Sequence, residues 1–133
     1  MKDSAKNAGD RRLEAPLLEL KSVRVAYGPI DGVKGLSFQV APGEIVTLIG
    51  SNGAGKTSTL RAISGLTPVR SGSILLRGKP IHNLAPHLVV SKRISHAPEG
   101  RGVFLNLSVE ENLDLGAWLI PKKSEVQDGL DMV

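Results

Sequence analysis

The feature that most constrains this chain is a glycine-rich segment between two runs of different periodicity. Residues 50–58 read Gly-Ser-Asn-Gly-Ala-Gly-Lys-Thr-Ser and fit the phosphate-binding pattern G-x-x-x-x-G-K-[ST]. Glycines at these positions let backbone N–H groups turn toward an anion. The apolar run 44–49 before the loop predicts a strand buried on both faces, and residues 59–64 after it have helical periodicity. The sequence therefore predicts a strand, a phosphate-binding loop and a helix in that order.

The residue types within the loop predict separate roles. Lys56 would reach the outer phosphates, and Thr57 would place its hydroxyl on Mg²⁺. The helix that begins there would direct its positive N-terminal end at the same charge. The alternative is a glycine turn with a chance lysine, but the strand–loop–helix context favours phosphate binding. The predicted nucleotide-binding residues of the loop are Gly50, Ser51, Asn52, Gly53, Ala54, Gly55, Lys56, Thr57 and Ser58.

Length and composition narrow the class of protein. The chain has 133 residues, 41% of them hydrophobic, which allows one domain with a core. It has no cysteine, which excludes disulfides and thiolate metal sites. Half of the net charge of +4 comes from the first twelve residues, where four basic side chains stand against Asp3 and Asp10, and aromatics make up only 3%. We therefore expect no nucleic-acid partner.

The N-terminal segment and the lengths of the apolar runs bear on location. Residues 1–15 are polar and without periodicity, which predicts a disordered leader and not a secretory signal. No apolar run approaches the length of a membrane span, so we expect any membrane association to come through a partner.

Outside the loop, short strands and helices alternate. The predicted strands are residues 17–25, 36–40, 71–76 and 94–97, with a turn at 77–80. A short helix is predicted at 86–93, with Pro86 in its first turn. A second helix begins at the capping box Ser108-Val-Glu-Glu111 and ends before Pro121. The three histidines, His82, His87 and His96, have no metal-ligand spacing, and we expect structural or solvent roles for them.

A tyrosine ahead of the loop completes a pattern of motifs. Taken with Tyr27 in Val-Ala-Tyr-Gly (25–28), residues 17–118 resemble the nucleotide-binding subunits of ABC transporters. The resemblance implies an α/β fold, a partial P-loop NTPase core with an N-terminal antiparallel β subdomain. It implies that Tyr27 stacks on adenine. The alternative for Tyr27 is a half-buried tyrosine that covers a strand end.

The loop after residue 97 is similar to one branch of that family. Pro98-Glu99-Gly100-Arg101 looks like the ATPases of branched-chain amino-acid importers, where most ABC ATPases have glutamine at the second position. The resemblance implies that Glu99 senses Mg²⁺ and the attacking water, a role that a carboxylate can fill as an acceptor. The alternative for Glu99 is a solvated loop residue.

The resemblance also implies cofactors, partners and location. They are ATP and Mg²⁺, a second ATP-binding subunit, and a transmembrane permease that holds the subunit on the cytoplasmic face of the membrane. The apolar face from Val109 to Ile120 is then core or permease-facing surface, with Trp118 as the exposed contact.

Three motifs of such ATPases are not found before Val133: a Ser-Gly-Gly signature, an acidic strand with a catalytic glutamate, and a switch histidine. Residues 16–133 would then be the N-terminal half of the domain, able to bind ATP without competent hydrolysis. The backbone at 44–49 would lie on an exposed edge, and we expect marginal stability. The alternatives are a nucleotide-binding module without turnover and another P-loop NTPase, such as a small-molecule kinase.

Overall fold

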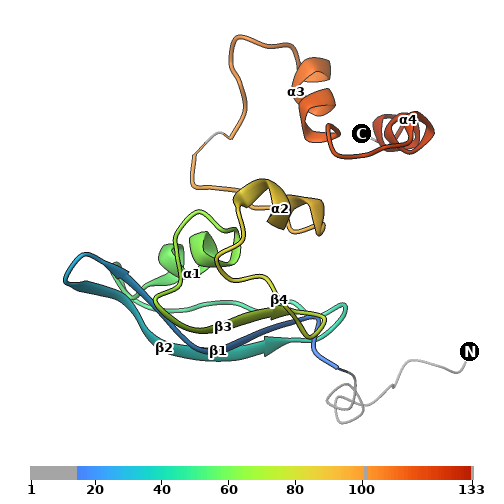
Figure 1. The fold of residues 1–133 in the computed structure, drawn as a ribbon. Helices are drawn as coiled ribbons and strands as arrows, with labels where there is room; N and C mark the ends of the chain where they lie inside the picture. The colour runs from blue at the N-terminus through green and yellow to red at the C-terminus, as the bar shows by residue number, and fades with distance from the viewer. Residues whose placement is uncertain (1–14, 101, 133) are drawn as a thin grey trace, which may run out of the picture. The chain divides into compact units, whose positions relative to one another are not determined.

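The computed structural model describes residues 15–100 and 102–132 (Figure 1). The chain divides into two compact units, Met1–Ser95 and His96–Val133. Of the predicted disordered leader, only Ala15 lies within the described residues.

The first unit is built on an antiparallel sheet. Its strands are β1 (Leu18–Tyr27), β2 (Ile30–Val40), β3 (Ser71–Leu76) and β4 (Lys79–Pro80), in the order β2-β1-β3-β4. The predicted antiparallel β subdomain is thus confirmed. Strand β2 begins six residues earlier than predicted, because the glycines at 32 and 35 interrupt the alternation by which a strand is recognised.

A bulge in β1 explains which of its side chains reach the core. Leu20 and Val23 are both buried, although a separation of three residues places side chains on opposite faces of a regular strand. The pairing of β1 shifts between these two residues, and Ser22 there has a φ of 47°. The backbone N–H of Ser22 donates to Ser37 Oγ at 2.8 Å. The inserted residue resets the alternation, so that both apolar side chains face inward.

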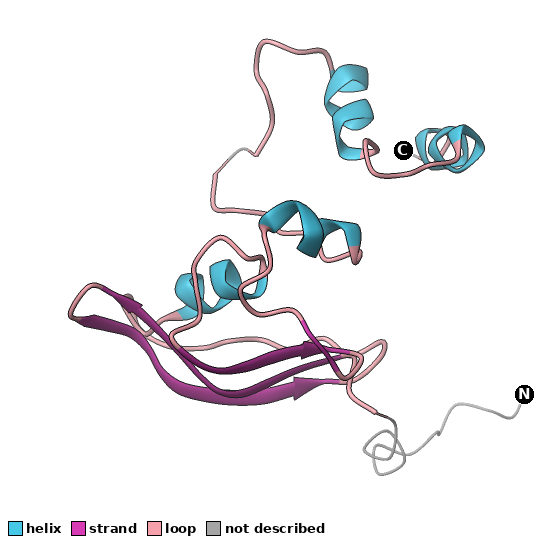
Figure 2. Cartoon of the chain, in the orientation of Figure 1, coloured by secondary structure: helices cyan, strands magenta, loops and turns pink. Residues whose placement is uncertain are grey.

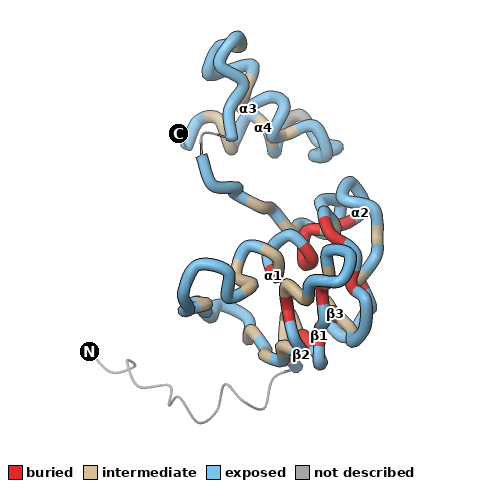
Figure 3. The backbone as a smooth tube through the Cα atoms, turned by 90° about the vertical axis from the view of Figure 1, so that its left-hand side faces the viewer, coloured by how far each residue is buried: buried red, intermediate tan, exposed pale blue. Residues whose placement is uncertain are grey.

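Two helices accompany the sheet in this unit, α1 (Lys56–Ile63) and α2 (Pro86–Ser91). Helix α1 lies over one face of the sheet (Figure 1), and the buried residues gather between them (Figure 3). Gly65 ends α1 with a φ of +73°, as predicted; a Cβ there would lie 2.6 Å from the Leu84 carbonyl oxygen. The core consists of Leu20, Val23, Val25, Val33, Ala62, Ile63, Val69, Ile74 and Ile81.

Two predicted strands do not form. Residues 44–49 are drawn as loop (Figure 2), and the side chains of Ile45 and Ile49 are 95% and 92% exposed. Residues 94–97 also lack strand structure. Neither segment pairs with a strand of the four-stranded sheet β2-β1-β3-β4, so within the described residues both lack the ladder of backbone hydrogen bonds that defines a strand.

The second unit contains helices α3 (Val109–Gly116) and α4 (Lys123–Leu130). The capping box at the start of α3 is confirmed: Ser108 Oγ accepts from the Glu111 N–H at 3.1 Å, and the Ser108 N–H donates to Glu111 Oε2 at 2.7 Å. Helix α3 ends at Gly116, before the predicted stop at Pro121, because glycine is a poor helix former. Helix α4 was not predicted.

Apolar side chains remain accessible in the second unit. Helix α3 buries none of its residues, and Trp118 is 81% exposed. The Asn112 side chain fixes the preceding loop: its Oδ1 accepts from the Phe104 N–H at 2.8 Å, and its Nδ2 donates to the carbonyl oxygens of Phe104 and Ser108. Throughout the described ranges, no helix is long and apolar enough to cross a bilayer.

Candidate functional site

The glycine loop connects the extended segment 44–49 to the first turn of α1. Gly53 and Gly55 have φ values of +85° and +88°, a region that side chains other than glycine rarely occupy. A Cβ at Gly55 would lie 2.3 Å from the Gly32 carbonyl oxygen. Backbone conformation and the close approach of β2 therefore both require glycine at position 55.

The Lys56 side chain closes over the loop. Its Nζ donates to the carbonyl oxygens of Gly50 at 2.6 Å and Ser51 at 2.8 Å. These contacts hold the amine next to the backbone of the loop, where an anion held by the loop would meet it. The amine can exchange carbonyl partners for a phosphate oxygen, which makes a stronger, charge-assisted hydrogen bond.

The start of α1 is open to an anion. Its N-cap residue, Gly55, makes no side-chain cap, and the first turn contains no acidic residue. The first N–H groups of a helix have no partners inside the helix, and together they carry part of the positive end of the helix dipole. The Thr57 side chain is exposed there. The predicted phosphate-binding residues therefore lie together at the N-terminal end of α1, where backbone N–H groups can donate hydrogen bonds to an anion.

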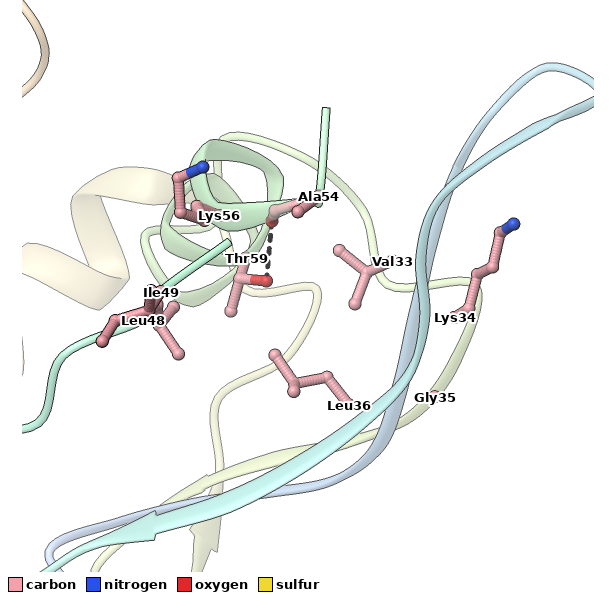
Figure 4. A pocket seen from close by; sticks show the side chains of 10 residues that line it. Val33, Lys34, Gly35, Leu36, Leu48, Ile49, Ala54, Lys56 and Thr59 are labelled. Atoms are coloured by element: carbon pink, nitrogen blue, oxygen red, sulfur yellow. Dashed lines mark hydrogen bonds between the residues drawn. The ribbon is translucent and has the colours of Figure 1, made fainter. Parts of the chain in front are cut away.

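Thr59 is a supporting residue that sequence reasoning missed. Its side chain is buried, and its Oγ1 donates to the Gly55 carbonyl oxygen at 2.9 Å (Figure 4). This bond fixes the peptide from which α1 starts. Its spacing from Ala62 and Ile63, which places it on the same buried face of α1, was the signal that could have revealed it.

Tyr27 lies at the end of β1 and reaches the same helix. Its hydroxyl donates to Ser58 Oγ at 3.3 Å, across a sequence separation of 31 residues. Hydrogen bonding with Ser58, and then with Thr67, lowers the pKa of the Tyr27 phenol. The tyrosine is 47% exposed, so part of its surface is available to a ligand. The fold thus places Tyr27 beside the first turn of α1.

A hollow of about 270 Å³ lies between the loop and the sheet. Its lining comes from β2, from residues 48–49 and from the start of α1 (Figure 4). Tyr27 and Ser58 are not among its lining residues. The hollow therefore borders the start of α1 through Gly55 and Lys56, but it does not extend to Tyr27.

Glu99 belongs to the second unit, in which it lies exposed on a loop before Gly100. Gly100 has a φ of +90°, a conformation that suits a turn. Arg101, the last residue of the predicted motif, lies outside the described residues. Among the residues that the structure does describe, no group of three or more histidines and carboxylates could hold a metal by itself.

Both the sequence and the fold are similar to those of known proteins. A family model for the ABC transporter matches residues 33–133. The high-affinity branched-chain amino acid transport ATP-binding protein BraG of Pseudomonas aeruginosa is 42% identical over 106 residues, which are 80% of this chain and 46% of that protein. The ribose import ATP-binding protein RbsA 2 of Escherichia coli O157:H7 is 38% identical over 104 residues, 78% of this chain and 21% of that protein.

A solved structure of an ATP binding subunit of an ABC transporter superposes with a TM-score of 0.72 and 33% sequence identity, over 82% of this chain and 45% of that one. This neighbour confirms the predicted α/β fold with a partial P-loop core. The chain spans less than half the length of the two curated relatives and of this structure.

Proposed function

The chain belongs to the ABC transporter family, and from this membership we propose that it is the ATP-binding part of a subunit that energises import of branched-chain or other hydrophobic amino acids. The observation that carries the ATP-binding step is the open N-terminus of α1, with Lys56 over the loop and Tyr27 beside it. Family membership favours this assignment over a small-molecule kinase.

The proposed site divides the nucleotide between two parts of the first unit. The loop 50–58 would hold the phosphates through its N–H groups and the Lys56 amine. Thr57 would offer its hydroxyl to Mg²⁺. The half-exposed Tyr27 would stack on adenine. When bound, Mg²⁺ neutralises charge on the phosphates of ATP, whose hydrolysis drives transport.

Glu99 is proposed as the residue that senses Mg²⁺ and the attacking water. Its exposed carboxylate beside a turn glycine is free to accept hydrogen bonds from a metal-bound water. The loop in which it lies would also carry movement to a permease. These roles belong to the complete ATPase, which we propose to be a dimer bound to a permease on the cytoplasmic face of the membrane.

The amino-acid substrate is supported by two observations. The Pro-Glu-Gly-Arg sequence at 98–101 is similar to that branch of the family, and BraG is named for branched-chain amino acids. RbsA 2 is named for ribose, so the test compares uptake of an amino acid with uptake of ribose. In the source organism, disruption of the gene should reduce uptake of labelled leucine and leave ribose uptake unchanged. The reverse result would contradict the amino-acid assignment.

Nucleotide binding and turnover are tested on the chain itself. Calorimetry should detect binding of both MgATP and inorganic triphosphate, because the loop recognises phosphate. A phosphate-release assay should show no turnover above a Lys56→Ala control, because no residue of this chain is identified that would complete hydrolysis. Absence of triphosphate binding would refute the phosphate site, and clear turnover would refute the proposal that this chain only binds.

A further inference from the structure

We propose that Thr67, in the loop between α1 and β3, is a positioning residue that holds the Tyr27 ring where the adenine of a nucleotide would stack. This inference rests on the proposed function, which it makes more specific, because it assigns the adenine end of the site to a residue outside the phosphate loop. Ser58 keeps its place in that loop, and Thr67 supplies the second hydroxyl that Tyr27 meets.

Two side-chain hydroxyls from different segments bond the phenol of Tyr27. The phenol donates to Ser58 Oγ at 3.3 Å, and a second side-chain hydrogen bond joins it to Thr67. Because the phenol proton goes to Ser58, the Thr67 hydroxyl is left to donate to the phenol oxygen. Both bonds, that with Ser58 first, lower the pKa of the phenol. The hydroxyl end of the ring is therefore held from two sides.

The loop that carries Thr67 is fixed on both sides of this residue. Before it, the Leu66 N–H donates to the Arg61 carbonyl oxygen at 2.8 Å. After it, the Asn83 side chain bonds both backbone groups of Val69, accepting from the N–H at 2.7 Å and donating to the carbonyl oxygen at 3.3 Å. Thr67 itself is only 6% exposed, and buried hydroxyls find their partners within the fold. The loop thus presents a hydroxyl to Tyr27 from a defined position.

Ser58 and Thr67 differ in what else they can bind. Ser58 lies in the first turn of α1, where the predicted phosphate donors are, so a bound nucleotide would also engage its hydroxyl. Thr67 lies beyond the end of that helix and is buried, so its hydroxyl stays with Tyr27. The bond to Thr67 therefore persists when the phosphate loop is occupied.

The edge of the tyrosine ring rests on a third segment, the backbone of β2 at Gly32. A Cβ at position 32 would lie 3.0 Å from Tyr27 Cε2 and 3.3 Å from Ser58 Oγ, so the ring packs directly against the strand. Thr67 at the hydroxyl end and Gly32 at the edge limit the positions that the ring can occupy. Even so, 47% of Tyr27 stays exposed, which leaves surface for a base.

A ring held in place binds a planar base better than a mobile ring does. Ordering a side chain on binding costs free energy, and a contact that orders it beforehand removes part of that cost. Inorganic triphosphate has no base and gains nothing from this effect. Loss of the Thr67 hydroxyl should therefore weaken adenine nucleotides selectively.

Two buried threonines allow a matched test by calorimetry on the full chain, with MgATP and with inorganic triphosphate plus Mg²⁺. Thr67→Val exchanges the hydroxyl for a methyl group; it should weaken ATP by about 2- to 10-fold, the range for one hydrogen bond, and leave triphosphate unchanged. Thr59 holds the Gly55 carbonyl oxygen, so Thr59→Val should weaken both ligands. Thr67→Ser keeps a hydroxyl and should bind ATP as the wild type does, and circular dichroism checks that each variant is folded.

A second readout comes from the phenol itself. Tyr27 is the only tyrosine of the chain, so the ultraviolet absorbance of tyrosinate follows its ionisation alone. Loss of a donor to the phenol oxygen destabilises the phenolate, so Thr67→Val should raise the pKa of Tyr27 toward its ordinary value. Thr59→Val should leave that pKa unchanged. An unchanged titration in Thr67→Val would overturn the inference.

A double-mutant cycle identifies Tyr27 as the partner. Tyr27→Phe removes only the phenol oxygen, and adding Thr67→Val to it should cost no further affinity for ATP. Equal loss of ATP and triphosphate in Thr67→Val, or additive losses in the cycle, would overturn the inference while leaving the phosphate site intact. Failure of the wild-type chain to bind triphosphate would overturn the proposed function, and this inference with it.

Discussion

Helices α1 and α3 begin in opposite ways. At α3, Ser108 and Glu111 satisfy each other's backbone N–H groups, and Glu110 adds negative charge to the first turn. At α1, Gly55 provides no side-chain cap, and the first turn contains a lysine and no acid. A capped start has used its donors within the protein, whereas an open start keeps them for an anion. The contrast separates a helix end closed by its own side chains from one that is open to an anion.

The largest effect is expected from Lys56→Ala, which removes the cation from the open start. Loss of a charge-assisted contact should weaken a fluorescent ATP analogue by at least about 3 kcal/mol, effectively abolishing binding. Lys34→Ala is the matched control, because Lys34 lines the hollow beside the loop but its amine points away from Lys56 (Figure 4). Retained affinity in Lys56→Ala would show that the loop does not hold phosphate.

The difference between the two helix starts can be removed by placing an acidic residue in the first turn of α1, as in α3. Thr57 occupies the second position of its helix, as Glu110 does in α3. Thr57→Glu should strongly weaken ATP binding, because the new carboxylate repels phosphate. The same change should leave unfolding stability equal or raise it by about 0.3–1 kcal/mol through the helix dipole. Binding by fluorescence and stability by urea titration should thus change in opposite directions; parallel losses would mean general damage.

Tyr27→Ala tests whether the nucleotide also contacts β1, outside helix α1. It should weaken adenine nucleotides by about 1–3 kcal/mol, the scale of base stacking on aromatic side chains. Inorganic triphosphate, which has no base, should bind as before, as measured by displacement of the same fluorescent analogue. A loss of the same size for both ligands would refute stacking.

Ser108→Ala sharpens the other half of the comparison. Removal of an N-cap should destabilise α3 by about 1 kcal/mol, detected as faster amide hydrogen exchange at residues 111 and 112. Ser108→Thr retains a capping oxygen and should show little change. Nucleotide affinity should stay the same, because Ser108 and the loop 50–58 belong to different units. A clear drop in ATP affinity would contradict this separation.

Local patterns were predicted well because their causes are local. The glycine loop, the capping box and the Gly65 stop each depend on a few neighbouring residues, and the structure contains the capping box and the stop as expected. Tyr27 was chosen by its place in a family pattern, and its contact with Ser58 depends on the packing of the hairpin against α1. The roles of the predicted site residues stay predictions.

Features that depend on distant partners were missed. The run 44–49 has the composition of a buried strand, yet burial depends on neighbours that the described residues do not provide. The bulge in β1 changes which residues face inward, and no pattern in the sequence announced it. The need for a small residue at Gly32 could not be predicted either, because it arises from the close approach of Tyr27 and Ser58 in the folded chain.

The two carbonyl contacts of the Lys56 amine bear on the heat released when a nucleotide binds. The amine already donates hydrogen bonds within the protein, so a phosphate replaces existing hydrogen bonds instead of adding new ones. The measured binding enthalpy will therefore report the difference between two bonded arrangements of one lysine. The binding enthalpy alone will understate how much Lys56 matters, and its importance will be visible in the loss of affinity when it is removed.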